Sequence, residues 1–228
     1  MYHVDHQDVR FVVLNANRDD ICELVRPADL ADFDCDEARG VWVRMQAVWL
    51  DRVLTENPST WTVVLHHQPV FSTGAGRDEP DIREAWLPVY QEHNVDLVLA
   101  GHDHTYTRGY VNDDATDTPG LTTGPVYVVA DAGSKFYDLQ PADDNVWTRN
   151  GATQVTRAQQ TSTYQAITVD GESLSYRSVI AHKGDDRAAP GEIGDTLDSF
   201  TVTRYADGTK WVTEEGVTPP ERPEDPDD

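Results

Sequence analysis

In the first 130 residues, short apolar runs recur along the chain and are separated by polar segments. Short runs rich in β-branched residues cover 9–14, 61–65, 95–100 and 126–130, and polar residues bound each run. Runs of this length and composition are typical of buried strands. We therefore predict four buried strands in this part of the chain.

Two segments between these runs carry apolar side chains three or four positions apart. They are residues 42–56, which Asn57-Pro58 brings to an end, and residues 81–93. This spacing predicts two amphipathic helices. Strands that alternate with helices are the wiring of an α/β sheet, in which functional residues gather at the carboxyl ends of the strands.

The second half of the chain has a different pattern, with two Asp-Gly pairs between apolar runs. Residues 164–169 and 174–180 flank Asp170-Gly171, and residues 199–205 and 210–213 flank Asp207-Gly208. Asp-Gly between strands favours a type I′ hairpin turn. We expect this half to be antiparallel and rich in strands.

Two segments fall outside these elements. Residues 15–41 are acidic and contain Pro27, so we interpret them as a long loop or insertion. Residues 216–228 consist largely of Pro, Glu and Asp, and we expect a disordered acidic tail. We predict that residues 1–215 belong to a single domain.

The charge balance narrows the range of partners. The 228 residues include 41 Asp and Glu against 18 Lys and Arg, so the formal net charge is −23. Nucleic acids and anionic membranes are bound through clustered Lys and Arg, and we therefore exclude both as partners. A surface this acidic is also typical of proteins from high-salt environments. The alternative is a genome that prefers Arg codons, which would explain why lysine is scarce in this sequence.

The sequence gives fewer indications of the cellular compartment than of the partners. No run of 18 apolar residues is present, and the residues after Met1 lack the pattern of a signal peptide. A disulfide between Cys22 and Cys35 would indicate an extracytoplasmic protein, whereas two free thiols would indicate the cytoplasm. We favour an extracytoplasmic or secreted protein whose true amino terminus lies upstream.

Candidate chemistry lies directly after two of the predicted strands. His66-His67-Gln68-Pro69 follows the second strand, and Gly101-His102-Asp103-His104 follows the third. Imidazole is the commonest metal ligand near neutral pH, and loops that leave neighbouring strands can direct their side chains to one point. A metal site at this edge of the sheet is one reading. The other is a binding or structural module in which the histidines are ordinary polar residues.

The residues around these motifs resemble a known family. The segments TWTVVLHHQPVFS at 60–72 and VDLVLAGHDHTYTR at 95–108 are similar to those of calcineurin-like metallophosphoesterases, in particular the purple-acid-phosphatase-like branch. The resemblance extends from Val9 to about Ile180. It implies a mixed α/β fold, a β-sandwich flanked by helices, and two metal ions that hydrolyse small phosphate esters.

The resemblance also implies roles for single residues. His67 and His102 match ligands of the second metal ion and His104 matches a ligand of the first. His66 matches a position that is not a ligand, and we expect it either to pack in the core or to support a ligand. Arg77 lies where related enzymes place histidines that contact the phosphate. We interpret it as a contact to the phosphate or the leaving group, and the alternative is a solvated arginine of the loop. The metals implied are iron, manganese or zinc, and the implied reaction is an in-line displacement at phosphorus of the acid-phosphatase type.

Three further motifs of the family are absent from the residues before the first histidine motif. They are an aspartate in D-x-H, a bridging aspartate in G-D and an asparagine in G-N-H, and all three lie upstream of the matched part. Asp103 does not replace them, because its side chain points away from its neighbours in an extended segment. We therefore expect the carboxyl-terminal half of a catalytic domain, arising from a truncated or split gene, from assembly with a separate amino-terminal half, or from decay to a non-catalytic paralogue.

Overall fold

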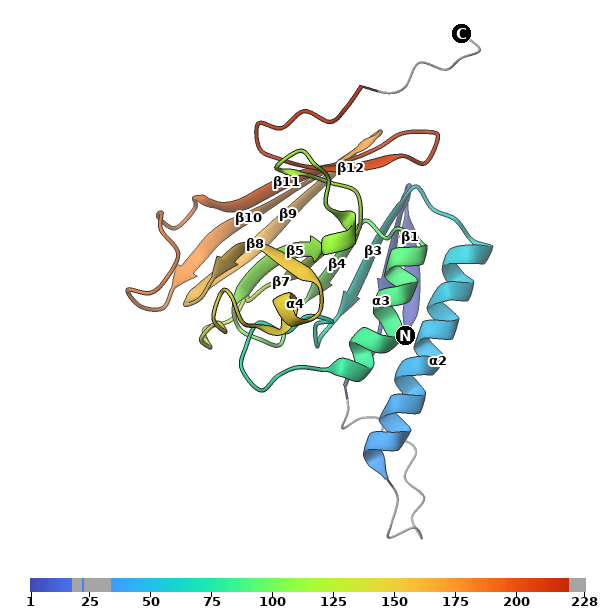
Figure 1. Ribbon diagram of the computed structural model, residues 1–228, viewed down its shortest axis with the longest axis horizontal. Helices are drawn as coiled ribbons and strands as arrows, with labels where there is room; N and C mark the ends of the chain where they lie inside the picture. Colours follow the sequence, from blue (N-terminus) through green and yellow to red (C-terminus); the bar gives the residue numbers. More distant parts are fainter. Residues whose placement is uncertain (18–21, 23–33, 222–228) are drawn as a thin grey trace.

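The computed structural model describes residues 1–17, 22 and 34–221 (Figure 1). Two β-sheets pack face to face, and helices cover the face of the larger sheet that points away from the smaller one. The predicted β-sandwich flanked by helices is confirmed. No helix in the described part of the chain is long and apolar enough to cross a membrane.

The larger sheet has seven strands in the order β1-β2-β3-β4-β7-β5-β8. Strands β2, β3, β4 and β7 run parallel, so their carboxyl ends meet at one edge, while β1, β5 and β8 run antiparallel to their neighbours. All four predicted buried strands are present in this sheet. Its strands are β1 (Tyr2–His6), β2 (Val9–Val13), β3 (Trp61–His66), β4 (Leu97–Ala100), β5 (Tyr106–Val111), β7 (Val126–Val129) and β8 (Ala152–Ala158).

Helices α2 (Cys35–Glu56) and α3 (Pro80–Glu92) pack on this sheet through a core that includes Leu50 and Trp86. Helix α2 begins at Cys35, so the prediction of a loop through residue 41 was wrong for its last part. The Asp34 side chain accepts hydrogen bonds from the backbone N–H groups of Asp36 and Glu37 and starts the helix there. Short helical turns also occur at η1 (Asn112–Asp114) and α4 (Val146–Arg149).

The smaller sheet has the order β6-β12-β11-β10-β9 and is antiparallel, as predicted. Both hairpins are present, but their turns differ from the prediction. Asp170 pairs with Ser173, so the first turn is Gly171-Glu172, and Arg204 pairs with Lys210, so the second spans 205–209. The strands are β6 (Leu121–Thr122), β9 (Thr161–Asp170), β10 (Ser173–Lys183), β11 (Thr196–Arg204) and β12 (Lys210–Glu214).

The two sheets are joined by an apolar core and by one buried arginine. Val63 and Leu97 of the larger sheet share a cluster with Leu174 of the smaller one. Arg108 of β5 donates two hydrogen bonds to Asp198 of β11 and two to Glu214 of β12, at 2.7–2.8 Å. The arginine therefore fastens the strand that follows the second histidine motif to the opposite sheet.

Two further predictions concern the ends of the described ranges. Cys22 and Cys35 form a disulfide with a Cα–Cα distance of 5.2 Å, while the rest of the predicted loop at 18–21 and 23–33 lies outside the described residues. Of the predicted disordered tail, residues 216–221 are described. There Pro220 accepts a hydrogen bond from the Tyr205 hydroxyl at 3.1 Å.

Candidate metal centre

The histidine motifs lie side by side at the carboxyl edge of the parallel strands. Backbone hydrogen bonds continue past the ends of the strands, from Gly101 N–H to the His67 carbonyl at 3.0 Å and from Ala130 N–H to the Ala100 carbonyl at 2.9 Å. The loops after β3, β4 and β7 are thereby held next to one another. The sheet thus brings the two histidine motifs together, as their positions at the strand ends predicted, and the loop after β7 joins them at the same site.

His67 and His102 converge on each other. The His67 Nε2 and His102 Nδ1 atoms are 3.2 Å apart, and the two rings are nearly perpendicular at 82° with centroids 5.0 Å apart. Two imidazole nitrogens bound to one zinc ion at about 2.0–2.1 Å, with a bond angle of about 90–110°, are separated by about 3.0–3.4 Å. The pair therefore fits two ligand positions of a single metal ion.

The charge state of His102 also suits a metal ligand. Burial, together with the nearby Arg77 cation, lowers the pKa of His102 to about 4. The ring is then neutral at physiological pH and retains a nitrogen lone pair, which a metal ion requires. His102 and His104 both have left-handed backbone conformations, with φ of 71° and 52°. These turns direct the two side chains out of the strand direction.

His104 lies in the same loop but apart from that pair. Its Nδ1 is 2.9 Å from the Lys135 carbonyl oxygen and 3.6 Å from Asp131 Oδ1. Both neighbours are hydrogen-bond acceptors, so Nδ1 carries the proton and Nε2 keeps the free lone pair. Across residues 1–17, 22 and 34–221, no three His, Cys, Asp or Glu side chains come together as a metal-holding group. The structure therefore gives a two-histidine half-site with a third histidine beside it.

Asp103, between the two histidines, has a structural role. Its fully buried carboxylate accepts hydrogen bonds from the Thr73 N–H at 2.5 Å, the Thr73 hydroxyl at 3.0 Å and Arg77 Nε at 3.0 Å. The expectation that its side chain points away from the histidines is confirmed. Asp103 anchors the loop at 73–77 to the histidine loop.

Arg77, the predicted phosphate contact, takes part in this anchor. Its Nη2 donates to the His102 carbonyl oxygen at 2.7 Å, and its guanidinium carbon is 4.8 Å from the centre of the Tyr137 ring. The Lys135 ammonium lies over the same ring, also at 4.8 Å. Two cations therefore flank His104 and His102 in an otherwise acidic protein. The Arg77 side chain is 24% exposed. Its contact with phosphate stays a prediction.

Sequence reasoning missed Asp131, Lys135 and Tyr137, which follow β7. Asp131 is 5% exposed, its Oδ2 has no hydrogen-bond partner in the described part of the chain, and burial raises its pKa. One pattern pointed to these residues, namely the polar segment directly after the strand predicted at 126–130. His66, by contrast, is buried against Trp86 and Tyr90, as expected for a packing residue.

Comparison with known proteins agrees with this arrangement. Residues 4–106 match the family model of the calcineurin-like phosphoesterases. The chain is therefore similar to this family over somewhat less than half of its length. It is similar to purple acid phosphatase 17 of Arabidopsis thaliana, with 28% identity over 116 residues, and to an acid phosphatase of Aspergillus ficuum, with 24% identity over 179 residues. An uncharacterized protein of Mycobacterium tuberculosis is 32% identical over 120 residues.

These matches cover only part of each relative. They include 50%, 74% and 50% of this chain, but 32%, 28% and 21% of the Arabidopsis, Aspergillus and Mycobacterium proteins. The chain thus spans less than a third of the length of these relatives. Its purple-acid-phosphatase-like character is shown by the shared segments, and the activity of the whole relatives is not thereby assigned to it.

Solved structures share the fold. The purple acid phosphatase PPD1 of yellow lupin superimposes with a TM-score of 0.58 at 18% identity, covering 90% of this chain and 33% of the lupin chain. PhoD superimposes with a TM-score of 0.54 at 16% identity, covering 96% of this chain and 44% of PhoD. The calcineurin-like phosphoesterase fold therefore extends over nearly all of the chain.

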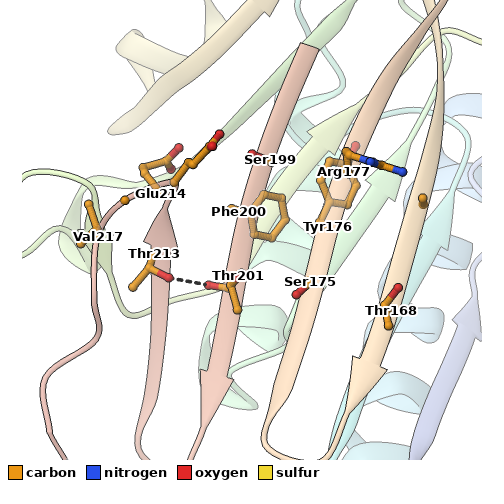
Figure 2. Close-up of a pocket in the computed structure, with 13 residues that line it drawn as sticks. Thr168, Ser175, Tyr176, Arg177, Ser199, Phe200, Thr201, Thr213, Glu214 and Val217 are labelled. Atoms are coloured by element: carbon orange, nitrogen blue, oxygen red, sulfur yellow. Dashed lines mark hydrogen bonds between the residues drawn. The ribbon is translucent and has the colours of Figure 1, made fainter. Parts of the chain in front are cut away.

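Among the grooves in the described part of the chain, one adjoins the histidine motifs and another lies on the smaller sheet. A mostly apolar groove of about 500 Å³ is lined by His66, His67, Leu65, Leu99 and Gln165 among others. Figure 2 shows the other groove, also about 500 Å³, on strands of the smaller sheet, where the Thr213 hydroxyl donates to the Thr201 carbonyl oxygen at 3.3 Å. None of the three candidate histidines lines this second groove, so it is separate from the candidate centre.

Proposed function

We propose that this chain contributes the histidine side of a metal-dependent phosphoesterase site. The observation that carries the proposal is the 3.2 Å approach of His67 Nε2 to His102 Nδ1, at the strand ends of a calcineurin-like phosphoesterase fold. Phosphatases among the similar proteins favour hydrolysis of small phosphate esters. Purple acid phosphatase relatives favour two divalent or trivalent ions, of iron, manganese or zinc.

Each residue has a distinct part in the proposed reaction. When bound, the metal ions supply Lewis-acid chemistry to the phosphoryl group. His67 Nε2 and His102 Nδ1 offer nitrogens for one ion, and His104 offers Nε2 when its proton is held on Nδ1. Arg77 and Lys135 add positive charge where an anionic phosphate would approach. The chain as a whole carries a net charge of −23, so the surface away from these two cations repels such a substrate.

The remaining ligands are proposed to come from outside the described residues. Two highly charged ions need carboxylate ligands in addition to three imidazoles. A separate amino-terminal half of the same domain, carrying D-x-H, G-D and G-N-H motifs, is the proposed source. Translation of the DNA that adjoins the coding region tests this source, and absence of those motifs would contradict it. The Cys22–Cys35 disulfide favours assembly in an extracytoplasmic compartment.

One observation favours a second candidate function. No metal-holding group of three or more side chains forms within residues 1–17, 22 and 34–221. A decayed paralogue that serves as a binding or structural module would have the same property. In that case, substitution of His67 or His104 would leave metal content unchanged.

Metal binding by the purified chain separates these candidates. Titration with Co²⁺, followed by visible absorption, measures affinity without a need for turnover. We expect weak binding of one ion, and we expect His67→Ala and His102→Ala each to lower the affinity at least tenfold. His6→Ala, in exposed strand β1, is the matched control and leaves the affinity unchanged. Equal affinity of all four proteins would overturn the proposal, and hydrolysis of p-nitrophenyl phosphate then tests the activity.

A further inference from the structure

Strand β1 (Tyr2–His6) is an open edge of the larger sheet. Within the described ranges it pairs with β2 alone, and all five of its residues are exposed. Tyr2 and Val4 are 57% and 52% exposed, and Val4 faces Phe11 across the strand pair. An exposed edge strand with apolar side chains is a template for pairing with a further strand.

The hairpin geometry shows which backbone groups are open. His6 pairs with Val9 across a two-residue turn, in which Gln7 has a positive φ of 53°. The residues that flank such a turn exchange backbone hydrogen bonds, and hydrogen-bonded and non-hydrogen-bonded positions alternate along the strand. His3 and Asp5 therefore direct their N–H and C=O groups toward the open side of β1.

The sequence of β1 is complementary to itself in one register. When two copies run antiparallel with Val4 at the centre, His3 of each copy lies opposite Asp5 of the other, and Tyr2 lies opposite His6. The residues with open backbone groups then meet each other as hydrogen-bonded pairs, and each pair places an imidazole donor opposite a carboxylate. We infer that the partner of this edge is a second copy of the chain, related by a two-fold axis through Val4.

Neighbouring registers are less favourable. A two-fold axis at His3 leaves Asp5 without an imidazole partner, and an axis at Asp5 places two aspartates opposite each other. Like charges directly across a strand pair are destabilising. In the monomer, His3 Nδ1 already lies 3.7 Å from Asp5 Oδ1, and Asp5 accepts two hydrogen bonds from Arg10 at 2.7 and 2.8 Å. The carboxylate is therefore fixed in place for the second copy's histidine.

The predicted dimer depends on salt in a characteristic direction. Each copy carries a net charge of −23, so two copies repel each other strongly in dilute buffer. Added salt screens this repulsion, because the Debye length falls from about 10 Å at 0.1 M to about 3 Å at 1 M, whereas the backbone hydrogen bonds at the axis remain. We expect association to strengthen from 50 mM to 1 M NaCl, as measured by sedimentation equilibrium.

Cysteine crosslinking tests the register directly. The two native cysteines form a disulfide with each other, so a new thiol reports on the dimer alone. Val4→Cys places two thiols opposite each other at the axis, at a distance that a disulfide can bridge. Tyr2→Cys, which is equally accessible, leaves its thiols about 14 Å apart in this register. With oxidised glutathione, Val4→Cys should form covalent dimers at least tenfold faster than Tyr2→Cys.

A second pair of variants distinguishes a loss of association from an effect on folding. Val4→Lys places two ammonium groups at the axis and should weaken association at least tenfold. Val48→Lys makes the same change at the more exposed Val48 of α2, which is 71% exposed, and should leave association unchanged. A monomeric chain at 1 M NaCl, equal crosslinking of the two cysteine variants, or equal weakening by the two lysine variants would overturn the inference.

Discussion

Arg77 Nε donates to the buried carboxylate of Asp103 at 3.0 Å, and this pair joins the loop after β3 to the loop that carries His102 and His104. Arg77 also donates to the His102 carbonyl oxygen, so the backbone beside the histidine pair is held from two directions. The central residue of the G-H-x-H motif therefore determines where its histidines lie.

Substitution of Asp103 should release this loop. Asp103→Asn removes the charge that faces Arg77 and two hydrogen bonds from Thr73, inside a site with no access for water. We expect a loss of about 1–3 kcal/mol in the free energy of unfolding, because Arg77 is partly solvated and retains part of its interaction with water. Urea denaturation measures the loss. Glu56→Gln, which removes an exposed pair with Arg52, is the control and should change stability by less than about 0.5 kcal/mol.

Asp131 should destabilise the fold at neutral pH. Burial raises the pKa of its carboxyl group, so the folded chain binds this proton more tightly than the unfolded chain does. Stability therefore falls as pH rises from the unfolded value of 3.8 through the folded value, and the ionised group destabilises the fold at pH 7. Asp131→Asn should raise the urea midpoint at pH 7, and the difference should vanish below pH 4.

The effect on His104 provides the second measurement for Asp131. The carboxylate lies 3.6 Å from His104 Nδ1 and favours the proton on that nitrogen. Long-range ¹H–¹⁵N spectra of the metal-free chain should show the Nδ1–H tautomer of His104, with a smaller population in Asp131→Asn. If Asp131→Asn left the tautomer population of His104 unchanged, the Lys135 carbonyl oxygen alone would hold the proton on Nδ1.

Lys210 should make stability rise with pH above neutrality. Its side chain is buried, and burial lowers its pKa to about 7, in spite of the nearby Asp96 carboxylate at 3.8 Å. Between pH 7 and the unfolded value of 10.5, the unfolded chain binds the extra proton, so the free energy of unfolding rises with pH by up to about 1.4 kcal/mol per unit. Lys210→Met should lack this rise in urea titrations at pH 7, 8 and 9. Parallel pH curves for the two proteins would contradict it.

Arg108 should be among the most sensitive positions for stability. The guanidinium is 2% exposed and is shared between Asp198 and Glu214 of the opposite sheet. Arg108→Met leaves the buried Asp198 carboxylate without its cation, which costs about 3–5 kcal/mol. Thermal unfolding should show the loss, whereas Arg149→Met, at an exposed ion pair with Asp144, should have little effect. Similar melting temperatures for both variants would refute this role for Arg108.

Periodicity predicted most of the layers of the fold. The four apolar runs and the helix at 81–93 were confirmed because continuous burial leaves a strong pattern in the sequence. The beginning of α2 was missed because residues 35–41 are polar, and the cap at Asp34 rather than an apolar stripe fixes the start. The turn at Gly171-Glu172 was shifted by one position, since the register depends on pairing along the whole of β9 and β10.

The candidate centre was predictable in its parts but not in its arrangement. Strand ends located His67 and His102, whereas their 3.2 Å approach depends on backbone turns that the sequence does not specify. His104 belongs to the same motif as His102, yet its side chain lies against the segment after β7. Asp131 was missed because an aspartate after a strand is common in turns, and its burial arises only when the three loops pack together.

The left-handed backbone at His102 and His104 has a consequence for protein engineering. Left-handed conformations are unfavourable for residues other than glycine, so a short peptide with the G-H-D-H sequence would not adopt them alone. Transfer of this motif to a new scaffold would therefore need the 73–77 loop, with Arg77 and Thr73 to bind Asp103. The smallest transplantable unit comprises both loops and the two parallel strands that precede them.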